Sequence, residues 1–170
     1  MCEPSVLIVE DDAGAIEAFE PMLKAHGYKV RVACDGVTAL LEIERSLPEA
    51  ILLDLHLPNM NGVEFLRRLR TIPPQADIPA AVITGDYLID DQTVRDIEAL
   101  SAKIFFKPLW EEDLLKIIGE LICGHLLHHR AMKSADPLVR RRCLTRTFQS
   151  VATTRRPVDR CRARPKRRRD

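Results

Sequence analysis

The sequence lacks any paired-cysteine motif. Its five cysteines, an odd number, are scattered along the 170 residues, and no two of them form a Cys-x-x-Cys pair. A disulfide framework needs paired cysteines, and a structural zinc site needs closely spaced ligands. The cysteines therefore argue against both and favour a reducing compartment.

Long apolar runs are missing as well. No stretch approaches the roughly 18 consecutive apolar residues of a transmembrane helix. The first apolar run, residues 6–9, is too short for the core of a signal peptide and follows no basic segment. Internal repeats at the periods of solenoid proteins are also absent. We expect a cytoplasmic protein without a membrane span.

Charge is distributed unevenly along the chain. Residues 1–124 carry 11 Lys and Arg against 22 Asp and Glu, a net charge of −11, whereas residues 125–170 carry 15 against 3, a net charge of +12. The second segment also has few apolar positions and no sustained period. We therefore predict one domain at residues 1–124 and a disordered, Arg-rich tail at residues 125–170.

Four short apolar runs are each followed by a charged or hydroxyl residue. The runs occupy residues 6–9, 50–53, 80–83 and 104–106, and the residues that follow them are, in order, Glu10-Asp11-Asp12, Asp54, Thr84 and Lys107. Continuous apolar runs are typical of strands in a parallel sheet that is covered on both faces. Segments with helical spacing lie between the runs, and residues 28–32 alternate like a further strand. Together these patterns predict an α/β fold, a doubly wound parallel sheet of five βα units.

Ligands of such sheets bind beyond the carboxyl ends of the strands. Glu10, Asp11 and Asp54 should converge there, and their mutual repulsion calls for a hard divalent cation such as Mg²⁺. Asp54 could then attack a phosphoryl donor as a nucleophile. Thr84 and Lys107 would stabilise the charge on the phosphoryl oxygens.

Each of these residues also has a simpler interpretation. Acidic residues suit the N-terminus of a helix, and Asp12 in particular could be a helix cap. Asp54 could be a turn residue, Thr84 a β-branched strand residue and Lys107 a solvated loop lysine. The functional interpretation is favoured because four separate fragments agree in order and position.

These fragments resemble the response-regulator receiver domains of bacterial two-component signalling. The matching fragments are Val9-Glu10-Asp11-Asp12, Asp54-Leu55-His56-Leu57-Pro58 with Gly62, Thr84-Gly85 and Lys107-Pro108. The resemblance covers residues 4–124. It implies a receiver of the single-domain type, with a flavodoxin-like sheet in strand order 2-1-3-4-5.

For the acidic residues the resemblance implies distinct roles. Asp54 would be the phosphoacceptor and, with Asp11, a direct ligand of Mg²⁺. Glu10 would bind the ion through water, and the backbone carbonyl of His56 would be a further ligand. Asp12 would lie at the rim of the site.

For the remaining site residues the resemblance implies a switch. Thr84 would be the hydroxyl that moves toward the phosphoryl group, and Lys107 the amine that pairs with it, before a cis bond to Pro108. Relatives often carry an aromatic residue three positions before the lysine, but Ile104 stands there in this chain. Because side chains alternate along a strand, Phe105 should face the side opposite Ile104.

The resemblance implies a phosphoacceptor switch with at most weak self-dephosphorylation, and not an enzyme. Its partners would be a histidine kinase or phosphotransfer protein, and a downstream protein that binds the surface of the fourth helix, fifth strand and fifth helix. An alternative is a nucleic-acid-binding regulator that acts through the tail at 125–170 and is gated by the receiver. A phosphatase of the haloacid-dehalogenase type fits poorly, because its nucleophile would lie on the first strand.

Overall fold

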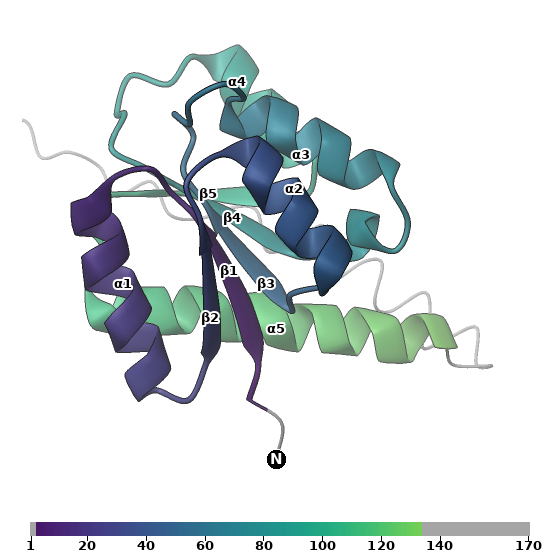
Figure 1. The fold of residues 1–170 in the computed structure, drawn as a ribbon. Helices are drawn as coiled ribbons and strands as arrows, with labels where there is room; N and C mark the ends of the chain where they lie inside the picture. The colour runs from purple at the N-terminus through teal and green to yellow at the C-terminus, as the bar shows by residue number, and fades with distance from the viewer. Residues whose placement is uncertain (1–2, 134–170) are drawn as a thin grey trace, which may run out of the picture. The chain divides into compact units, whose positions relative to one another are not determined.

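Five parallel strands form one sheet in the computed structural model, which describes residues 3–133. They are β1 (Ser5–Val9), β2 (Lys29–Ala33), β3 (Ala50–Leu53), β4 (Ala80–Thr84) and β5 (Ala102–Phe106). Their order across the sheet is β2-β1-β3-β4-β5, and every neighbouring pair is parallel (Figure 1). The predicted α/β class and strand order are therefore confirmed.

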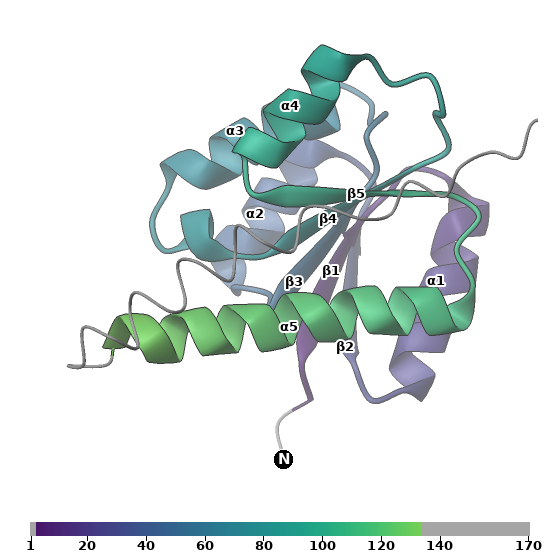
Figure 2. The ribbon, with the colours of Figure 1, turned by 180° about the vertical axis from the view of Figure 1, so that it is seen from behind.

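Helices alternate with the strands and cover both faces of the sheet. They are α1 (Ala13–Ala25), α2 (Gly36–Arg45), α3 (Gly62–Thr71), the short 3₁₀ helix η1 (Gln75–Asp77), α4 (Asp91–Ala99) and α5 (Glu111–Lys133). Figures 1 and 2 show α1 and α5 on one face of the sheet and α2, α3 and α4 on the other. This arrangement is the predicted doubly wound one.

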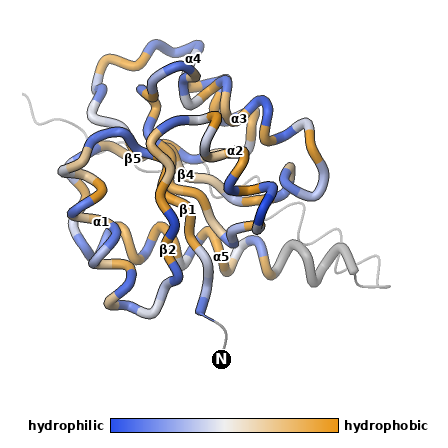
Figure 3. Tube along the Cα trace, viewed as in Figure 1, coloured by the Kyte–Doolittle hydropathy of each residue, from blue (hydrophilic) through white to orange (hydrophobic). Residues whose placement is uncertain are grey.

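The strands are apolar on both sides because both sides are buried. Toward α2, α3 and α4, a first core cluster includes Leu7, Leu53, Val82, Phe65 and Ile97. Toward α1 and α5, a second cluster includes Ile8, Leu52, Ile83, Phe19 and Leu114. Figure 3 shows the hydrophobic strands between the helices. With both faces filled, polar chemistry is left to the strand ends.

Short polar side chains begin four of the helices. Asp12, Asp35, Asn61 and Asp90 each accept a hydrogen bond from a backbone N–H in the first turn of α1, α2, α3 and α4, respectively. Such caps satisfy donors that have no partner within the helix. The expectation that Asp12 could be a cap is confirmed. After α1 the chain turns at Gly27, whose φ of 80° favours glycine.

Helix α5 continues to Lys133, so the predicted domain boundary at residue 124 falls inside it. The helix therefore includes the first nine residues, 125–133, of the segment that was predicted to be a tail. A change in composition suggested the boundary, but the first proline beyond it is Pro137, and nothing before that stops a helix. The rest of the predicted tail, residues 134–170, lies outside the described residues. Among the helices of the described part, none has the length and apolar character needed to cross a membrane.

Candidate functional site

Three carboxylates gather where β1 and β3 end. Glu10 and Asp11 follow β1, and Asp54 follows β3. The backbone N–H of Asp54 donates to the carbonyl of Val9 at 2.8 Å, which keeps the two strand ends side by side. One carboxylate oxygen from each acidic residue lies within 4.8 Å of those from the other two. The fold thus brings together the three acidic residues that the sequence singled out.

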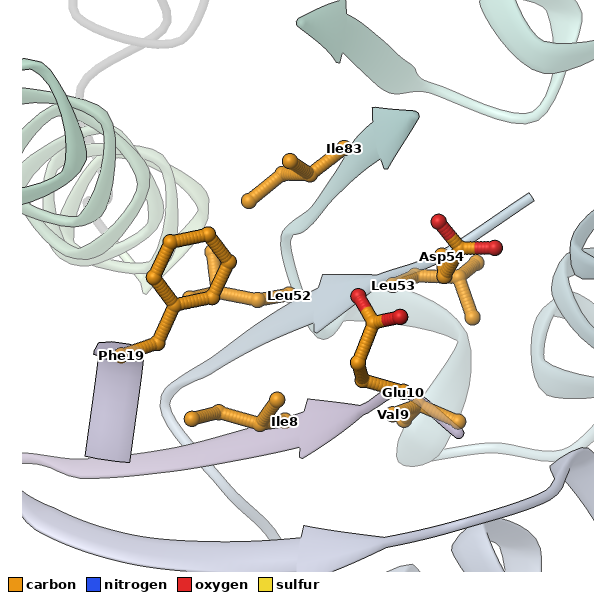
Figure 4. A pocket seen from close by; sticks show the side chains of 8 residues that line it. All are labelled: Ile8, Val9, Glu10, Phe19, Leu52, Leu53, Asp54 and Ile83. Atoms are coloured by element: carbon orange, nitrogen blue, oxygen red, sulfur yellow. The ribbon is translucent and has the colours of Figure 1, made fainter. Parts of the chain in front are cut away.

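Two of these carboxylates are buried against apolar side chains. Glu10 is 4% exposed and Asp54 7% exposed, whereas Asp11 is exposed. Figure 4 shows the Glu10 and Asp54 carboxylates at the strand ends, with Phe19 and Leu52 among the apolar residues beside them. Burial raises the pKa of Glu10 above its ordinary value, and the negative charge of Asp54 adds to this, although Lys107 opposes it.

Lys107 lies between the two buried carboxylates. It follows β5, and its Nζ donates to Glu10 Oε2 at 2.7 Å and to Asp54 Oδ1 at 3.1 Å. Burial alone would lower the pKa of Lys107, but its hydrogen bonds and ion pairs with Glu10 and Asp54 raise it above the ordinary value. Its peptide bond to Pro108 is cis, as predicted.

Thr84 and His56 border the acidic cluster. The His56 backbone N–H donates to Asp54 Oδ2 at 2.6 Å. Thr84 ends β4 and is fully buried; its hydroxyl oxygen accepts the backbone N–H of Asp86 at 3.1 Å, and its carbonyl accepts the backbone N–H of Lys107 at 2.8 Å. The fold therefore joins the β4 and β5 ends next to the carboxylates.

Asp86 is a residue of the site that sequence reasoning missed. Its Oδ2 lies 3.1 Å from Nε2 of His56, across the loops that follow β3 and β4. The backbone N–H of Leu88, and then the hydrogen bond with His56, hold the pKa of Asp86 below its ordinary value. Its only signal in the sequence was its place two residues after Thr84.

Tyr87 was missed as well. Its hydroxyl donates a hydrogen bond to the backbone carbonyl of Lys107, and its ring stacks on Phe106.

Ile104 packs against the core cluster toward α2, α3 and α4, whereas Phe105 packs against the cluster toward α1 and α5. The predicted opposite orientation of Ile104 and Phe105 is thus confirmed.

Known proteins share this sequence pattern. The response regulator receiver domain family matches residues 6–119. Transcriptional regulatory protein PrrA of Mycobacterium tuberculosis is 30% identical over 156 residues, which cover 92% of this chain and 58% of PrrA. Response regulator MprA of Mycobacterium leprae is 33% identical over 117 residues, covering 69% of this chain and 50% of MprA. The chain thus spans between half and three fifths of the length of these relatives.

Solved structures share the fold. A CheY-like receiver domain protein from Methanospirillum hungatei is 26% identical, with a TM-score of 0.66 over 72% of this chain and 95% of that one. The receiver domain of a sensor histidine kinase from Pseudomonas aeruginosa is 27% identical, with a TM-score of 0.64 over 71% of this chain and 98% of that one; it holds a magnesium ion in its active site cleft. The acidic triad Glu10, Asp11 and Asp54 is consistent with such a site. With its family match, its strand order and this triad, the chain belongs to the response regulator receiver domain family, whose members are phosphoacceptor signalling modules rather than metabolic enzymes.

Proposed function

We propose that this chain is a two-component response regulator whose Asp54 accepts a phosphoryl group from the phosphohistidine of a histidine kinase or phosphotransfer protein. One observation carries the proposal: Lys107 Nζ contacts both Glu10 and Asp54, beside the third carboxylate of Asp11. Such a site is suited to phosphoryl chemistry, because the ammonium can stabilise charge on the phosphoryl oxygens and the carboxylates can hold a divalent cation that does the same.

The transfer is a displacement at phosphorus. An oxygen of the Asp54 carboxylate forms a bond to phosphorus while the bond from phosphorus to the imidazole nitrogen breaks. The electron pair of the broken bond returns to that nitrogen, and the imidazole leaves neutral when its other nitrogen carries a proton. A separate hydrolysis resets the site: the oxygen of a water molecule forms a bond to phosphorus, the bond from phosphorus to Asp54 breaks, and inorganic phosphate leaves with the protons of the water, so that Asp54 is again a carboxylate.

Thr84 and Lys107 would change their contacts when Asp54 carries a phosphoryl group, and so couple the site to the rest of the domain. Without it, Lys107 contacts Glu10 and Asp54, and the Thr84 hydroxyl oxygen accepts the N–H of Asp86. Phosphoryl oxygens on Asp54 would compete for the Lys107 ammonium and for the Thr84 hydroxyl proton. A shift of Thr84 would move the loop before α4 and reshape the surface of α4, β5 and α5, where a downstream protein would bind.

The acidic triad fits Mg²⁺. Its carboxylates carry three negative charges, Lys107 supplies one positive charge, and the exposed Asp11 gives a hydrated ion access. Asp11 and Asp54 would be direct ligands, Glu10 would bind through water, and the backbone carbonyl of His56 would be a further ligand. When bound, the ion supplies positive charge next to the phosphoryl oxygens.

The test is intact-mass detection of a phosphoryl adduct after incubation with acetyl phosphate, with and without Mg²⁺. We expect one adduct on the wild-type chain, dependent on Mg²⁺, and none on Asp54→Asn. Asp11→Asn should form the adduct much more slowly, whereas the matched control Asp113→Asn, an exposed aspartate in the first turn of α5, should behave as wild type. An adduct that persists in Asp54→Asn would contradict the proposal.

A second function is favoured by the alignment with PrrA, which extends well beyond residue 119, where the family match ends. In this function the segment 125–170, with its net charge of +12, binds nucleic acid phosphates, and retention on DNA falls steeply with salt. The comparison is between the full chain and a chain ending at Lys133, which keeps α5 whole. Retention that ignores the truncation would contradict this second function.

A further inference from the structure

Tyr87 connects the loop after β4 to the residue that carries the site amine. It lies three residues beyond Thr84, and its hydroxyl donates to the backbone carbonyl of Lys107. Its ring stacks on Phe106, the last residue of β5, with ring centroids 5.4 Å apart and planes 13° from parallel. Two contacts therefore tie Tyr87 to the end of β5.

The segment 84–87 makes hydrogen bonds to both the N–H and the carbonyl of Lys107. Its N–H donates to the carbonyl of Thr84 at 2.8 Å, and its carbonyl accepts the hydroxyl of Tyr87. The position of this backbone sets where the side chain starts, and Nζ must reach both Glu10 and Asp54. Small displacements of a catalytic group have large effects on rate, so the anchoring matters to the chemistry.

The position often occupied by an aromatic residue in relatives cannot supply this connection here. Ile104 is aliphatic and packs into the core, and Phe105 faces the other side of the sheet. Tyr87 and Phe106, in contrast, are 66% and 43% exposed. A movement of the segment that starts at Thr84 would therefore change an aromatic pair that lies at the surface.

We propose that Tyr87 is a positioning residue for phosphoryl transfer: its hydroxyl fixes the Lys107 backbone relative to Thr84, so that the ammonium meets the phosphoryl oxygens at Asp54. The inference rests on the function proposed above and adds a residue to it. The stacked Tyr87–Phe106 pair then links the state of the site to the surface, in place of an aromatic residue at position 104.

The test compares rates of adduct formation from acetyl phosphate at saturating Mg²⁺. Tyr87→Phe keeps the ring and removes only the hydroxyl. We expect its maximal rate to fall by a factor of about two to ten, as for the loss of one hydrogen bond, with little change in the acetyl phosphate concentration that gives half the maximal rate. The matched control is Tyr28→Phe, the chain's other tyrosine, which packs on the core toward α1 and α5 and should keep the wild-type rate.

A double-mutant cycle separates positioning from a general structural role. Lys107→Ala removes the amine but keeps the carbonyl that Tyr87 binds. In that background Tyr87→Phe should have no further effect, whereas an undiminished effect there would overturn the inference. If the wild-type chain forms the adduct and Tyr87→Phe forms it at the same rate, the inference is overturned and the proposed function stands. If the wild-type chain forms no adduct, both the proposed function and the inference are overturned.

Discussion

Lys107 shows how a single residue determines the charge balance of the site. Its ammonium lies within hydrogen-bond distance of two buried carboxylates, and Asp11 adds a third carboxylate nearby. Burial strengthens these interactions because the surroundings are less polarisable than water. The same burial raises the pKa of Glu10, because it disfavours the charged carboxylate, whereas the hydrogen bond and the charge of Lys107 favour it. These charges are the ones that the proposed cation and phosphoryl group would meet at the site.

Arg70 is a polar residue outside the site for which we expect a clear effect on stability. Its guanidinium donates to the carbonyls of Leu100, Ala76 and Ile78 at 2.8–2.9 Å, and burial lowers its pKa. A lysine ammonium cannot reach three carbonyls in the geometry of the planar fork. Arg70→Lys should therefore lower the free energy of unfolding by roughly 1–3 kcal/mol, measured by urea denaturation.

The control for this change is Arg68→Lys. Arg68 lies two residues earlier on α3, and its guanidinium pairs with the half-buried Glu64, four residues before it, at the surface. An exposed pair of this kind is worth little, so the change should stay within about 0.5 kcal/mol. Equal losses in the two variants would contradict the structural role assigned to Arg70.

At the residue scale, the sequence predicted the charged site better than its surroundings. Glu10, Asp54 and Lys107 each follow an apolar run, and parallel strands end at one edge, so their convergence was predictable. Asp86 and Tyr87 were not found, because their contacts depend on how two loops fold against strand ends. Neither periodicity nor spacing reports that conformation.

At the scale of elements, the start of α3 is fitted closely against the end of β3. The backbone N–H of Gly62 donates to the carbonyl of Leu55 at 2.9 Å. A Cβ at position 62 would lie 2.8 Å from the backbone oxygen of Asp54 and 3.1 Å from Cα of Leu55. The position therefore requires glycine because of close approach between two backbones.

Gly62→Ala should destabilise the domain by about 1–3 kcal/mol, because α3 must move away from β3. It should also slow adduct formation, since the clash falls on the backbone of Asp54. The measurements are urea denaturation and the rate with acetyl phosphate. The matched control is Gly119→Ala in α5, where a Cβ would meet no heavy atom within 4 Å. This substitution should raise the free energy of unfolding by up to about 1 kcal/mol, because alanine favours the helix more than glycine does. Stability equal to wild type in Gly62→Ala would contradict the predicted clash.

The cap of α2 predicts a pH dependence. Hydrogen bonds from the backbone and hydroxyl of Thr38, and from the backbone of Val37, hold the pKa of Asp35 below its ordinary value. As pH falls, the unfolded chain takes up a proton at this residue before the folded chain does. The stability from the charged cap is therefore complete above the ordinary pKa of aspartate and is lost as pH falls through the lowered pKa.

Asp35→Asn isolates this effect, because asparagine also caps helices but does not titrate. At about pH 6 the variant should be less stable than wild type by roughly 0.3–1 kcal/mol, the usual effect of a charge at a helix N-terminus. This difference in unfolding free energy should shrink toward about pH 3. A difference that stays constant over that range would contradict the assignment.

The end of α5 marks the limit of prediction at this scale. Apolar spacing predicted that a helix would be present, whereas the end was placed where the charge changes sign, nine residues before Lys133. Residues 125–133 contain neither proline nor glycine, so local propensity allows the helix to continue. The change in charge coincides with Gly124, a residue that often follows a helix end, but here the helix continues through it.

At the scale of the whole molecule, the sequence separates charge between two segments. The net charge is −11 for residues 1–124 and +12 for residues 125–170. A net charge near zero for the whole chain therefore hides two segments that would attract different partners. The acidic segment contains the carboxylate cluster, and it favours cations close to the site.

This charge, together with the fold, predicts that Mg²⁺ stabilises the folded chain. Glu10, Asp11 and Asp54 meet only after β1 and β3 pair, so the unfolded chain offers no such cluster. A ligand that binds only the folded state stabilises it by RT ln(1 + [L]/Kd), about 2.7 kcal/mol at one hundred times Kd. Unfolding in urea at rising Mg²⁺ and constant ionic strength should therefore move to higher urea concentrations.

Asp11→Asn should lose most of this gain, since the substitution removes the exposed carboxylate of the triad. Without Mg²⁺ the variant should be at least as stable as wild type, because the repulsion among the carboxylates is relieved. Glu98→Gln, an exposed acidic residue on α4, should keep the full gain. Constant ionic strength matters because screening alone weakens repulsion throughout an acidic domain. An equal gain in all three proteins would mean that Mg²⁺ acts through general screening, whereas loss in Asp11→Asn alone would place the ion at the ends of β1 and β3.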